Sequence, residues 1–445
     1  MLTAAIFGFI AVPIVVARPE YGAYAILLVS PLIAGIARGQ LGSMLRPSEV
    51  LLAFVAFCLC IRSMLQVRRG RDERSFDELD TSLLLLVATG SVAPVLWRYV
   101  RGLPLSEDDL LYAVVLIKYY ALFRVFRYAV ATPRQVEVCL ALSVLSGVLV
   151  AAVGLLQVGN VLGVAEFLLA NFDQPFEGHT DILVERATST LATAFGLADI
   201  MVMNVVIALC LARTARWPVF PLLATLVLLG GCIAAGEFSG YLGLVVGLLA
   251  FAFVTGRFDQ VLRIGIACGC VAAPLMRPVI AVRLEGFQDQ ELPSSWAGRW
   301  SNLTTYYFPD LFDGGNWLLG VRPSPRIAAF ESWREWVYLE SGYLWLLWIG
   351  GIPFLIAFGF FAAVSLRILR DIARQRTDAI GAAATSAFAY LVSMLVTMLF
   401  DPHLTLRGSA DLFFPLLALS SLDRGEARDL RGFGTATATP SRQRA

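Results

Sequence analysis

The chain has 445 residues, of which 58% are hydrophobic and 16% are charged, and its mean hydropathy is +0.72. This composition excludes an ordinary soluble protein, in which about a quarter of the residues are charged, and it predicts an all-α, polytopic membrane helix bundle. The net charge of +1 at pH 7 gives no basis for nucleic-acid binding.

Apolar stretches of about 17 to 25 residues recur along residues 1–423, and each is long enough to cross the hydrocarbon core as a helix. We therefore predict one transmembrane domain with about 12 to 14 spans. The approximate spans are 2–17, 21–37, 48–65, 81–98, 109–126, 135–157, 190–212, 218–236, 239–256, 260–282, 338–364, 379–400 and 409–422.

The first apolar stretch, Met1 to Ala17, has no basic residues before it and leads through Arg18-Pro19-Glu20 straight into the second stretch. This pattern predicts a short helical hairpin, and a cleaved signal peptide is the alternative.

Arginines are concentrated in alternate connections between the predicted spans, which the positive-inside rule places in the cytoplasm. These connections are 62–74, 124–134, 213–216, 257–263, 367–376 and 424–431. The opposite, extracytoplasmic side then receives residues 160–189, the turn 236–238, one large loop at 283–337, and residues 401–407. Residues 424–445 are polar and low in complexity, which predicts a disordered cytoplasmic tail.

Aromatic residues are concentrated in or just after the large loop. A belt of aromatics at the membrane interface is one explanation, but a belt should mark both faces, and gathering on one face also fits a platform that stacks on sugar rings. Trp300 and Tyr343 are therefore candidate substrate-binding residues. The tryptophans concerned are Trp296, Trp300, Trp317, Trp333, Trp336, Trp345 and Trp348.

Two arginines, Arg186 and Arg299, fall on the predicted extracytoplasmic side, where the positive-inside rule disfavours arginine. Each needs a partner, which is either a carboxylate in an ordinary loop ion pair or the phosphate oxygens of a ligand. Glu340 begins the span that follows the large loop. A carboxylate there either stabilises the first turn of the helix through the helix dipole or acts as a general base near a hydroxyl.

Three short segments carry a family resemblance. Residues 186–191 (RATSTL) resemble an Arg-Ala-Thr-Gly-Thr-Phe motif that opens a central span, and residues 299–303 (RWSNL) fit an Arg-x-x-x-Leu motif in a large outer loop. Residues 340–351 match a His-x10-Gly pattern in length, with Tyr343 and Leu344 at its usual Tyr-Leu. Together with the layout of residues 135–365, these segments resemble the superfamily of O-antigen ligases and O-antigen polymerases.

The resemblance implies a bacterial, multi-pass protein of the cytoplasmic membrane that transfers a saccharide from a polyprenyl-diphosphate carrier to an acceptor hydroxyl outside that membrane. It also implies a glycan or lipid acceptor, polysaccharide assembly proteins as partners, and no cofactor or metal. Arg186 and Arg299 would stabilise the diphosphate leaving group, and Glu340 would accept the proton of the attacking hydroxyl.

Two departures from the family pattern affect this expectation. Glu340 stands where the family has histidine, and Ser239-Gly240-Tyr241 stands where the family often has Ser-Arg-Gly, so that one expected arginine is missing. The departures count against a ligase that uses a lipid A core acceptor more than against sugar polymer chemistry in general.

Three further polar residues are weaker substrate-binding candidates on the same side. Glu237 lies in a tight turn near the missing arginine, and Asp401 and His403 follow the end of a span. We expect His403, like His179, to be a solvated loop residue rather than a catalyst. Asp289-Gln290-Glu291 superficially matches an acidic metal-binding motif of nucleotide-sugar transferases, but those donors are cytoplasmic and this loop is not.

A transporter or flippase of lipid-linked sugars is the main alternative function. Transporters commonly carry internal repeats and ionisable residues near mid-membrane, whereas this chain shows no convincing repeat and few such residues, chiefly Lys118 and Asp199. Lys118 could reach the interface, and Asp199 could form a hydrogen bond within the bundle. A non-enzymatic organiser of a polysaccharide assembly machine is a third possibility, and it would tolerate changes at Arg186, Arg299 and Glu340.

Overall fold

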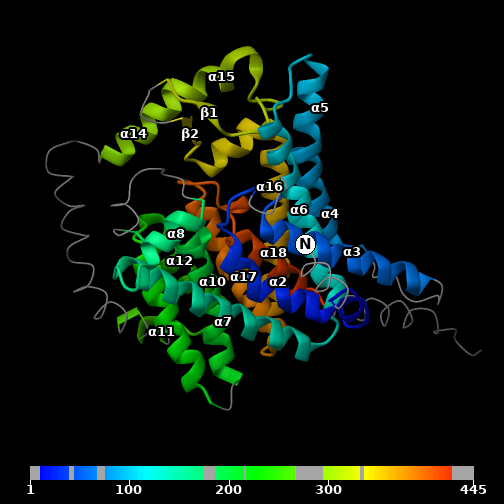
Figure 1. Ribbon diagram of the computed structural model, residues 1–445, viewed down its shortest axis with the longest axis vertical. Helices are drawn as coiled ribbons and strands as arrows, with labels where there is room; N and C mark the ends of the chain where they lie inside the picture. The colour runs from blue at the N-terminus through cyan, green and yellow to red at the C-terminus, as the bar shows by residue number, and fades with distance from the viewer. Residues whose placement is uncertain are drawn as a thin grey trace, which may run out of the picture.

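The structure is a computed structural model that describes residues 11–39, 45–67, 76–173, 186–214, 217–259, 261–263, 265–266, 294–330 and 335–422. The predicted tail at 424–445 and nearly all of the predicted span at 260–282 lie outside these residues. The all-α prediction is confirmed, because helices dominate and the described strands are one antiparallel pair of two residues each. Figure 1 shows the helices packed into a bundle with a smaller group of elements at one end.

The longer elements of the bundle, in chain order, are α2 (Glu20–Ile33), α3 (Pro47–Val67), α4 (Glu78–Val87), η1 (Ala88–Val92), α5 (Ala93–Val100), α6 (Glu107–Ala129), α7 (Pro133–Val158), α8 (Val164–Asn171), α10 (Ala194–Thr214), α11 (Val219–Ala234), α12 (Phe238–Thr255), α16 (Gly342–Gln375), α17 (Ala379–Thr397) and α18 (Ser409–Ser420). Between them lie the short turns η2 (Ser189–Leu191) and η5 (His403–Thr405).

Seven of the described helical segments are long and apolar enough to cross a membrane, and the bent pair Ala11–Ala17 and Glu20–Ile33 makes up to eight. The chain is therefore a multi-pass membrane protein. The described part reaches fewer spans than the predicted 12 to 14 for identifiable reasons. The two N-terminal stretches form one pair bent by 119°, α11 and α18 have only 16 and 12 residues, and α6 contains six charged side chains.

Helices α10 and α17 form the centre of the bundle. Their apolar windows are 89% and 78% buried, whereas that of α3 is 28% buried. Small side chains allow this packing, as in other membrane bundles. Gly243 and Gly247 of α12 face Ser393 of α17, and the Ser393 hydroxyl donates a hydrogen bond to the Gly243 carbonyl at 2.9 Å.

Part of the predicted large loop is folded into a structure that we call the cap. It comprises α14 (Ser294–Asn302), η3 (Leu303–Tyr307), α15 (Phe308–Phe312), η4 (Asp313–Gly315), β1 (Ile327–Ala328) and β2 (Trp336–Val337), and it lies at the upper end of the molecule in Figure 1, at the level of α5. The Tyr307 hydroxyl oxygen lies 2.8 Å from the carbonyl oxygens of both Pro325 and Val337, and its single proton is donated to one of the two. These contacts tie the helical part of the cap to its strand pair.

The cap enters the bundle at a break in α16. Gly351 has φ +62° and ψ −155°, which interrupts the helix. At the break the Ile352 N–H donates to the Leu318 carbonyl at 3.2 Å, and the Val321 N–H donates to the Trp348 carbonyl at 2.7 Å. The backbone of residues 317–321 is therefore hydrogen-bonded to a membrane helix, while the side chains of residues 317–319 are exposed.

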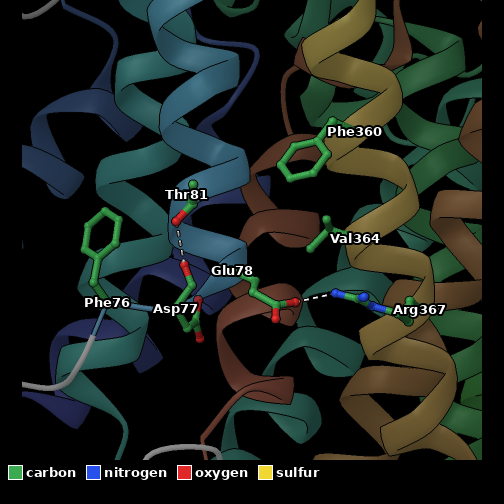
Figure 2. A pocket seen from close by; sticks show the side chains of 7 residues that line it. All are labelled: Phe76, Asp77, Glu78, Thr81, Phe360, Val364 and Arg367. Atoms are coloured by element: carbon green, nitrogen blue, oxygen red, sulfur yellow. Dashed lines mark hydrogen bonds and ion pairs between the residues drawn. The ribbon is translucent and has the colours of Figure 1, made fainter.

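We name the two ends of the bundle after residues of α16, which runs from the Glu340 end to the Arg367 end. Figure 2 shows a pocket at the Arg367 end between α4 and α16, where Glu78 forms an ion pair with Arg367. Its lining residues are Phe76, Asp77, Glu78, Thr81, Phe360, Val364 and Arg367. Because Arg367 lies 27 residues beyond Glu340 along the chain, this pocket belongs to the end opposite the predicted site residues.

Candidate functional site at the Glu340 end

Arg186 is positioned by a buried segment that directly follows it and ends in the short 3-10 turn η2. Residues 187–191 lie within the bundle, where the Gln157 side-chain carbonyl accepts from the N–H groups of Thr188 and Ser189 at 3.1 and 2.8 Å. The Ala187 N–H donates to the Ala234 carbonyl of α11 at 2.8 Å. The RATSTL segment therefore anchors Arg186 to the bundle beside the turn between α11 and α12.

That turn supplies the partner of Arg186. Glu237, the residue before α12, has its Oε1 atom 3.0 Å from Nη1 of Arg186. The Arg186 side chain is 37% exposed and the Glu237 side chain 18% exposed, so the pair is partly accessible. The two candidates, separated by 51 residues, are direct partners.

Arg299 of α14 connects the cap to two membrane helices. Its Nε lies 3.5 Å from Oε2 of Glu340, just before α16, and its Nη2 lies 3.5 Å from Oδ2 of Asp401, after α17. Its Nη1 also donates to the Phe400 carbonyl at 3.4 Å. Three predicted site residues, Arg299, Glu340 and Asp401, are thus brought together from three different elements.

The start of α16 lies directly against the end of α17, which brings Glu340 and Asp401 to the same guanidinium group of Arg299. The Gly342 N–H donates to the Met398 carbonyl at 2.8 Å, and a Cβ at Gly342 would lie 2.4 Å from the Met398 sulfur. The Tyr343 hydroxyl donates to the Leu395 carbonyl at 2.7 Å. Tyr343, predicted to bind substrate, therefore joins α16 to α17.

An aromatic contact connects the segment that carries the Arg186–Glu237 pair to the segment that carries Asp401. Phe238 follows Glu237, Phe400 precedes Asp401, and their rings meet edge to face with centroids 6.3 Å apart. The Glu340 end consequently holds the Arg186–Glu237 pair and the Arg299–Glu340–Asp401 group on adjoining segments, and we call these five residues the candidate site.

His403 is not the solvated loop residue that the sequence predicted. Its side chain is buried, and Nδ1 lies 2.8 Å from Oδ2 of Asp199 on α10. The Tyr390 hydroxyl donates to the same Asp199 oxygen at 3.0 Å. The prediction was wrong because it rested only on the position of His403 outside the predicted spans, whereas η5 packs against Asp199 of α10 and Tyr390 of α17.

The environment of His403 favours its charged form. Burial lowers the pKa of the imidazole, but the negative charges of Asp199, Asp401 and Glu237 raise the pKa above its ordinary value of 6.5. His403 also lies two residues after Asp401, and its N–H donates to the Asp401 carbonyl at 2.9 Å. The buried His403–Asp199 pair therefore fixes the connection that presents Asp401 to Arg299.

The aromatic candidates divide into surface and core residues. Trp300 of α14 is 62% exposed and contacts Phe308 edge to face, so most of its side chain is accessible. Trp345 and Trp348 are buried in α16, and the Trp348 indole N–H donates to the Ser324 carbonyl at 2.9 Å. His179, Trp333, residues 289–291 and the side chain of Trp296 lie outside the described residues.

The charges of the candidate site nearly balance. Two guanidinium groups face three carboxylates, which leaves the site with one excess negative charge when all five groups are ionised. Each arginine is held by a carboxylate that a more strongly charged phosphate could replace. Such a site offers hydrogen-bond acceptors for hydroxyl groups, together with guanidinium groups that can change partners.

No protein-family model matches this chain, and no curated protein sequence matches it. Within the residues that the structure describes, no group of three or more His, Cys, Asp or Glu side chains is arranged to hold a metal ion. The metal-independent reaction expected from the sequence remains a prediction.

Proposed function

We propose that the protein is a membrane glycan polymerase or ligase, which transfers a saccharide from a polyprenyl-diphosphate carrier to an acceptor hydroxyl at the Glu340 end. The observation that carries this proposal is the contact of Arg299 with both Glu340 and Asp401, next to the Arg186–Glu237 pair. Guanidinium groups suit a departing diphosphate and carboxylates suit a hydroxyl that must lose a proton. The site combines both groups at the boundary of a membrane bundle.

The reaction needs one bond to form as another breaks. The acceptor oxygen attacks the anomeric carbon, the bond from that carbon to the diphosphate oxygen breaks, and the hydroxyl proton passes to a carboxylate. Negative charge develops on the leaving diphosphate, where Arg299 and Arg186 would stabilise it electrostatically. A single displacement of this kind inverts the anomeric centre.

The ion pair suggests how Glu340 would become a base. In the free protein Arg299 is the ion-pair partner of both Glu340 and Asp401. A bound diphosphate would compete for the guanidinium, and the released Glu340 carboxylate would then accept the proton. The base would thus become active when the donor is present.

The decisive experiment compares E340Q with E335Q in the chromosomal gene. Glu335 is an exposed cap residue and keeps the same chemical change away from Arg299. E340Q should reduce polymer or ligated glycan by about two to four orders of magnitude, the usual contribution of a general base. E335Q should retain wild-type glycan, with both proteins present in the membrane at equal amounts.

Deletion of the gene separates the possible products of the reaction. Accumulated single lipid-linked repeat units would identify a polymerase, and carrier-bound polymer that never reaches its acceptor would identify a ligase. Wild-type glycan in E340Q would remove Glu340 from the reaction, and unchanged surface glycan and lipid-linked intermediates after deletion would contradict the transferase.

A transporter of lipid-linked sugars is the second candidate, and a buried charge pair favours it. Lys118 of α6 lies 3.3 Å from Asp411 of α18, and both side chains are largely buried within the helix bundle. Intramembrane charges often mark transport pathways. Purified protein in vesicles distinguishes the two functions, because a flippase moves a lipid-linked saccharide between leaflets without changing it, whereas a transferase consumes the donor and releases the carrier diphosphate.

A further inference from the structure

A second group of arginines lies at the Glu340 end, and the proposed transfer does not use it. Arg38 follows α2, Arg46 directly precedes α3, and Arg407 precedes α18. Nη2 of Arg46 and Nη1 of Arg407 each lie 3.2 Å from Oδ2 of Asp173. Two guanidinium groups therefore share a single carboxylate oxygen.

The third arginine extends the same group. Nη2 of Arg38 lies 3.5 Å from Oε1 of Glu49, and Glu49 also accepts the Arg46 backbone N–H at 3.0 Å. The Arg38 Nε is buried and has no hydrogen-bond partner among the described residues. Three guanidinium groups thus face two carboxylates, which leaves one unbalanced positive charge and one unused donor.

The excess positive charge of the group contributes to a lower pKa of Arg46. Burial lowers the pKa of Arg46 to about 10, and the positive charges of Arg407 and Arg38 contribute to that decrease although Asp173 opposes it. Only 13% of the Arg46 side chain is exposed, compared with 29% for Arg38 and 31% for Arg407. A further anion would therefore be attracted to the exposed side of Arg38 and Arg407, next to the buried Arg46.

The position of this group indicates the kind of anion. Arg46 directly precedes Pro47, where the membrane-spanning helix α3 begins, and the ends of such helices lie at the level of lipid head groups. The first turn of α3 adds the positive end of a helix dipole. Arginine forks match the several oxygens of a phosphate better than the one carboxylate oxygen that Arg46 and Arg407 now share.

We propose that Arg38, Arg46 and Arg407 form a binding site for the phosphate or diphosphate head group of a membrane lipid. Asp173 occupies the position of the anion in the free protein and competes with the lipid for Arg46 and Arg407. This inference goes beyond the transfer reaction, because an enzyme and a flippase would both use such a site to hold a lipid phosphate.

Binding is tested on the full chain in phosphatidylcholine nanodiscs with three probes: farnesyl diphosphate, inorganic diphosphate, and phosphatidylglycerol added to the disc. R46Q/R407Q should weaken farnesyl diphosphate binding by about tenfold or more, because two charge-assisted hydrogen bonds are lost. D173N should strengthen it, because the competing carboxylate loses its charge. The matched control is R134Q/R263Q, which removes two exposed arginines with carboxylate partners one helical turn away at the Arg367 end.

The three probes separate the sources of the phosphate. Tight binding of farnesyl diphosphate alone identifies an isoprenoid carrier, similar affinity for inorganic diphosphate identifies recognition of the free anion, and displacement by phosphatidylglycerol identifies a phospholipid. Each of these three results supports the anion site if the R46Q/R407Q variant binds the same probe more weakly than wild type. Equal affinity in wild type and R46Q/R407Q, or an equal loss in R134Q/R263Q, would overturn the proposal.

A folding defect in the double variant is controlled by two further measurements. R46K/R407K keeps both charges but not the planar forks, and its affinity should lie between those of wild type and R46Q/R407Q. Farnesyl diphosphate should also raise the melting temperature of D173N more than that of wild type. A smaller increase in D173N would contradict competition by Asp173. None of these readouts depends on glycan transfer, so failure of the transfer proposal leaves them unaffected.

Discussion

Replacement of Gly351 by alanine tests whether the break in α16 is a required feature of the fold. At φ +62° and ψ −155° the backbone occupies a region that is essentially restricted to glycine, and a non-glycine residue there costs about 1 to 3 kcal/mol. The new Cβ would also lie 2.3 Å from the Leu318 carbonyl oxygen, which is backbone and cannot rotate away. We therefore expect G351A to lose at least about 3 kcal/mol, since displacement of the cap adds to the backbone strain.

The same helix supplies the matched control. Gly359 lies eight residues later in regular helix, and a Cβ there meets nothing within 4 Å. G359A should be neutral or stabilising by up to about 1 kcal/mol, because alanine favours the helix. Thermal unfolding of both purified variants in the same detergent gives the comparison. Equal melting temperatures for G351A and wild type would refute the idea that this glycine holds the cap in α16.

Three other predictions concern the buried His403–Asp199 pair, the buried Lys118–Asp411 pair and the exposed side chain of Trp300. Because the pKa of His403 is raised in the folded state, the protonated imidazole should stabilise the fold fully below pH 6.5, and this stabilisation should disappear as the pH rises through the folded-state pKa. Melting curves of wild type and D199N across this pH range test the direction, and D199N should lose the pH dependence. K118M should destabilise by about 3 to 5 kcal/mol by leaving Asp411 buried without its partner, and K118M/D411L should recover most of that loss in the same unfolding assay. W300A should change stability by less than about 0.5 kcal/mol, because the side chain is largely exposed, and should reduce glycan yield if Trp300 stacks on sugar.

The membrane fold could be predicted because hydropathy is a local property of the sequence. Spans such as Pro133–Val158 and Ala379–Thr397 were expected within a few residues of their observed positions. The number of spans was less predictable. The charged side chains of α6 are paired in the folded protein, for instance Arg124 and Arg127 with Asp80, and such tertiary partners cannot be identified from an apolar window.

The break at Gly351 gives a structural reason for the spacing between Glu340 and Gly351, which the sequence alone did not reveal. The spacing from Glu340 to Gly351 indicated a family pattern, but the pattern alone gave no reason for the glycine. In the structure, Glu340 precedes the first turn of α16, and Gly351 ends the first helical segment. Next to this glycine, the backbone of the cap forms hydrogen bonds with Trp348 and Ile352 of α16. The spacing therefore reflects the length of one helical segment between the Arg299 contact and the cap insertion.

The partners of the site residues could be predicted only in part. Arg186 and Arg299 were predicted as site residues because arginine is unusual on the predicted extracytoplasmic side, and Glu237 and Asp401 were weaker candidates on the same side. Their pairing depends on segments that are 51 and about 100 residues apart in the chain. The same exception to the positive-inside rule could have indicated Arg46 and Arg407, whose shared partner Asp173 is 127 and 234 residues away from them.

The connection between α17 and α18 gives the Glu340 end its organisation. Within seven residues it presents Asp401 to Arg299, His403 to Asp199 and Arg407 to Asp173. The middle contact is buried, while the outer two are more accessible and carry opposite charge surpluses: negative in the candidate site and positive around Arg46. Hydroxyl-rich sugar chemistry suits the first surplus and a lipid phosphate suits the second. A lipid-linked saccharide has both parts, and a connection held by the buried His403–Asp199 contact would keep the two surfaces at a fixed spacing for such a molecule.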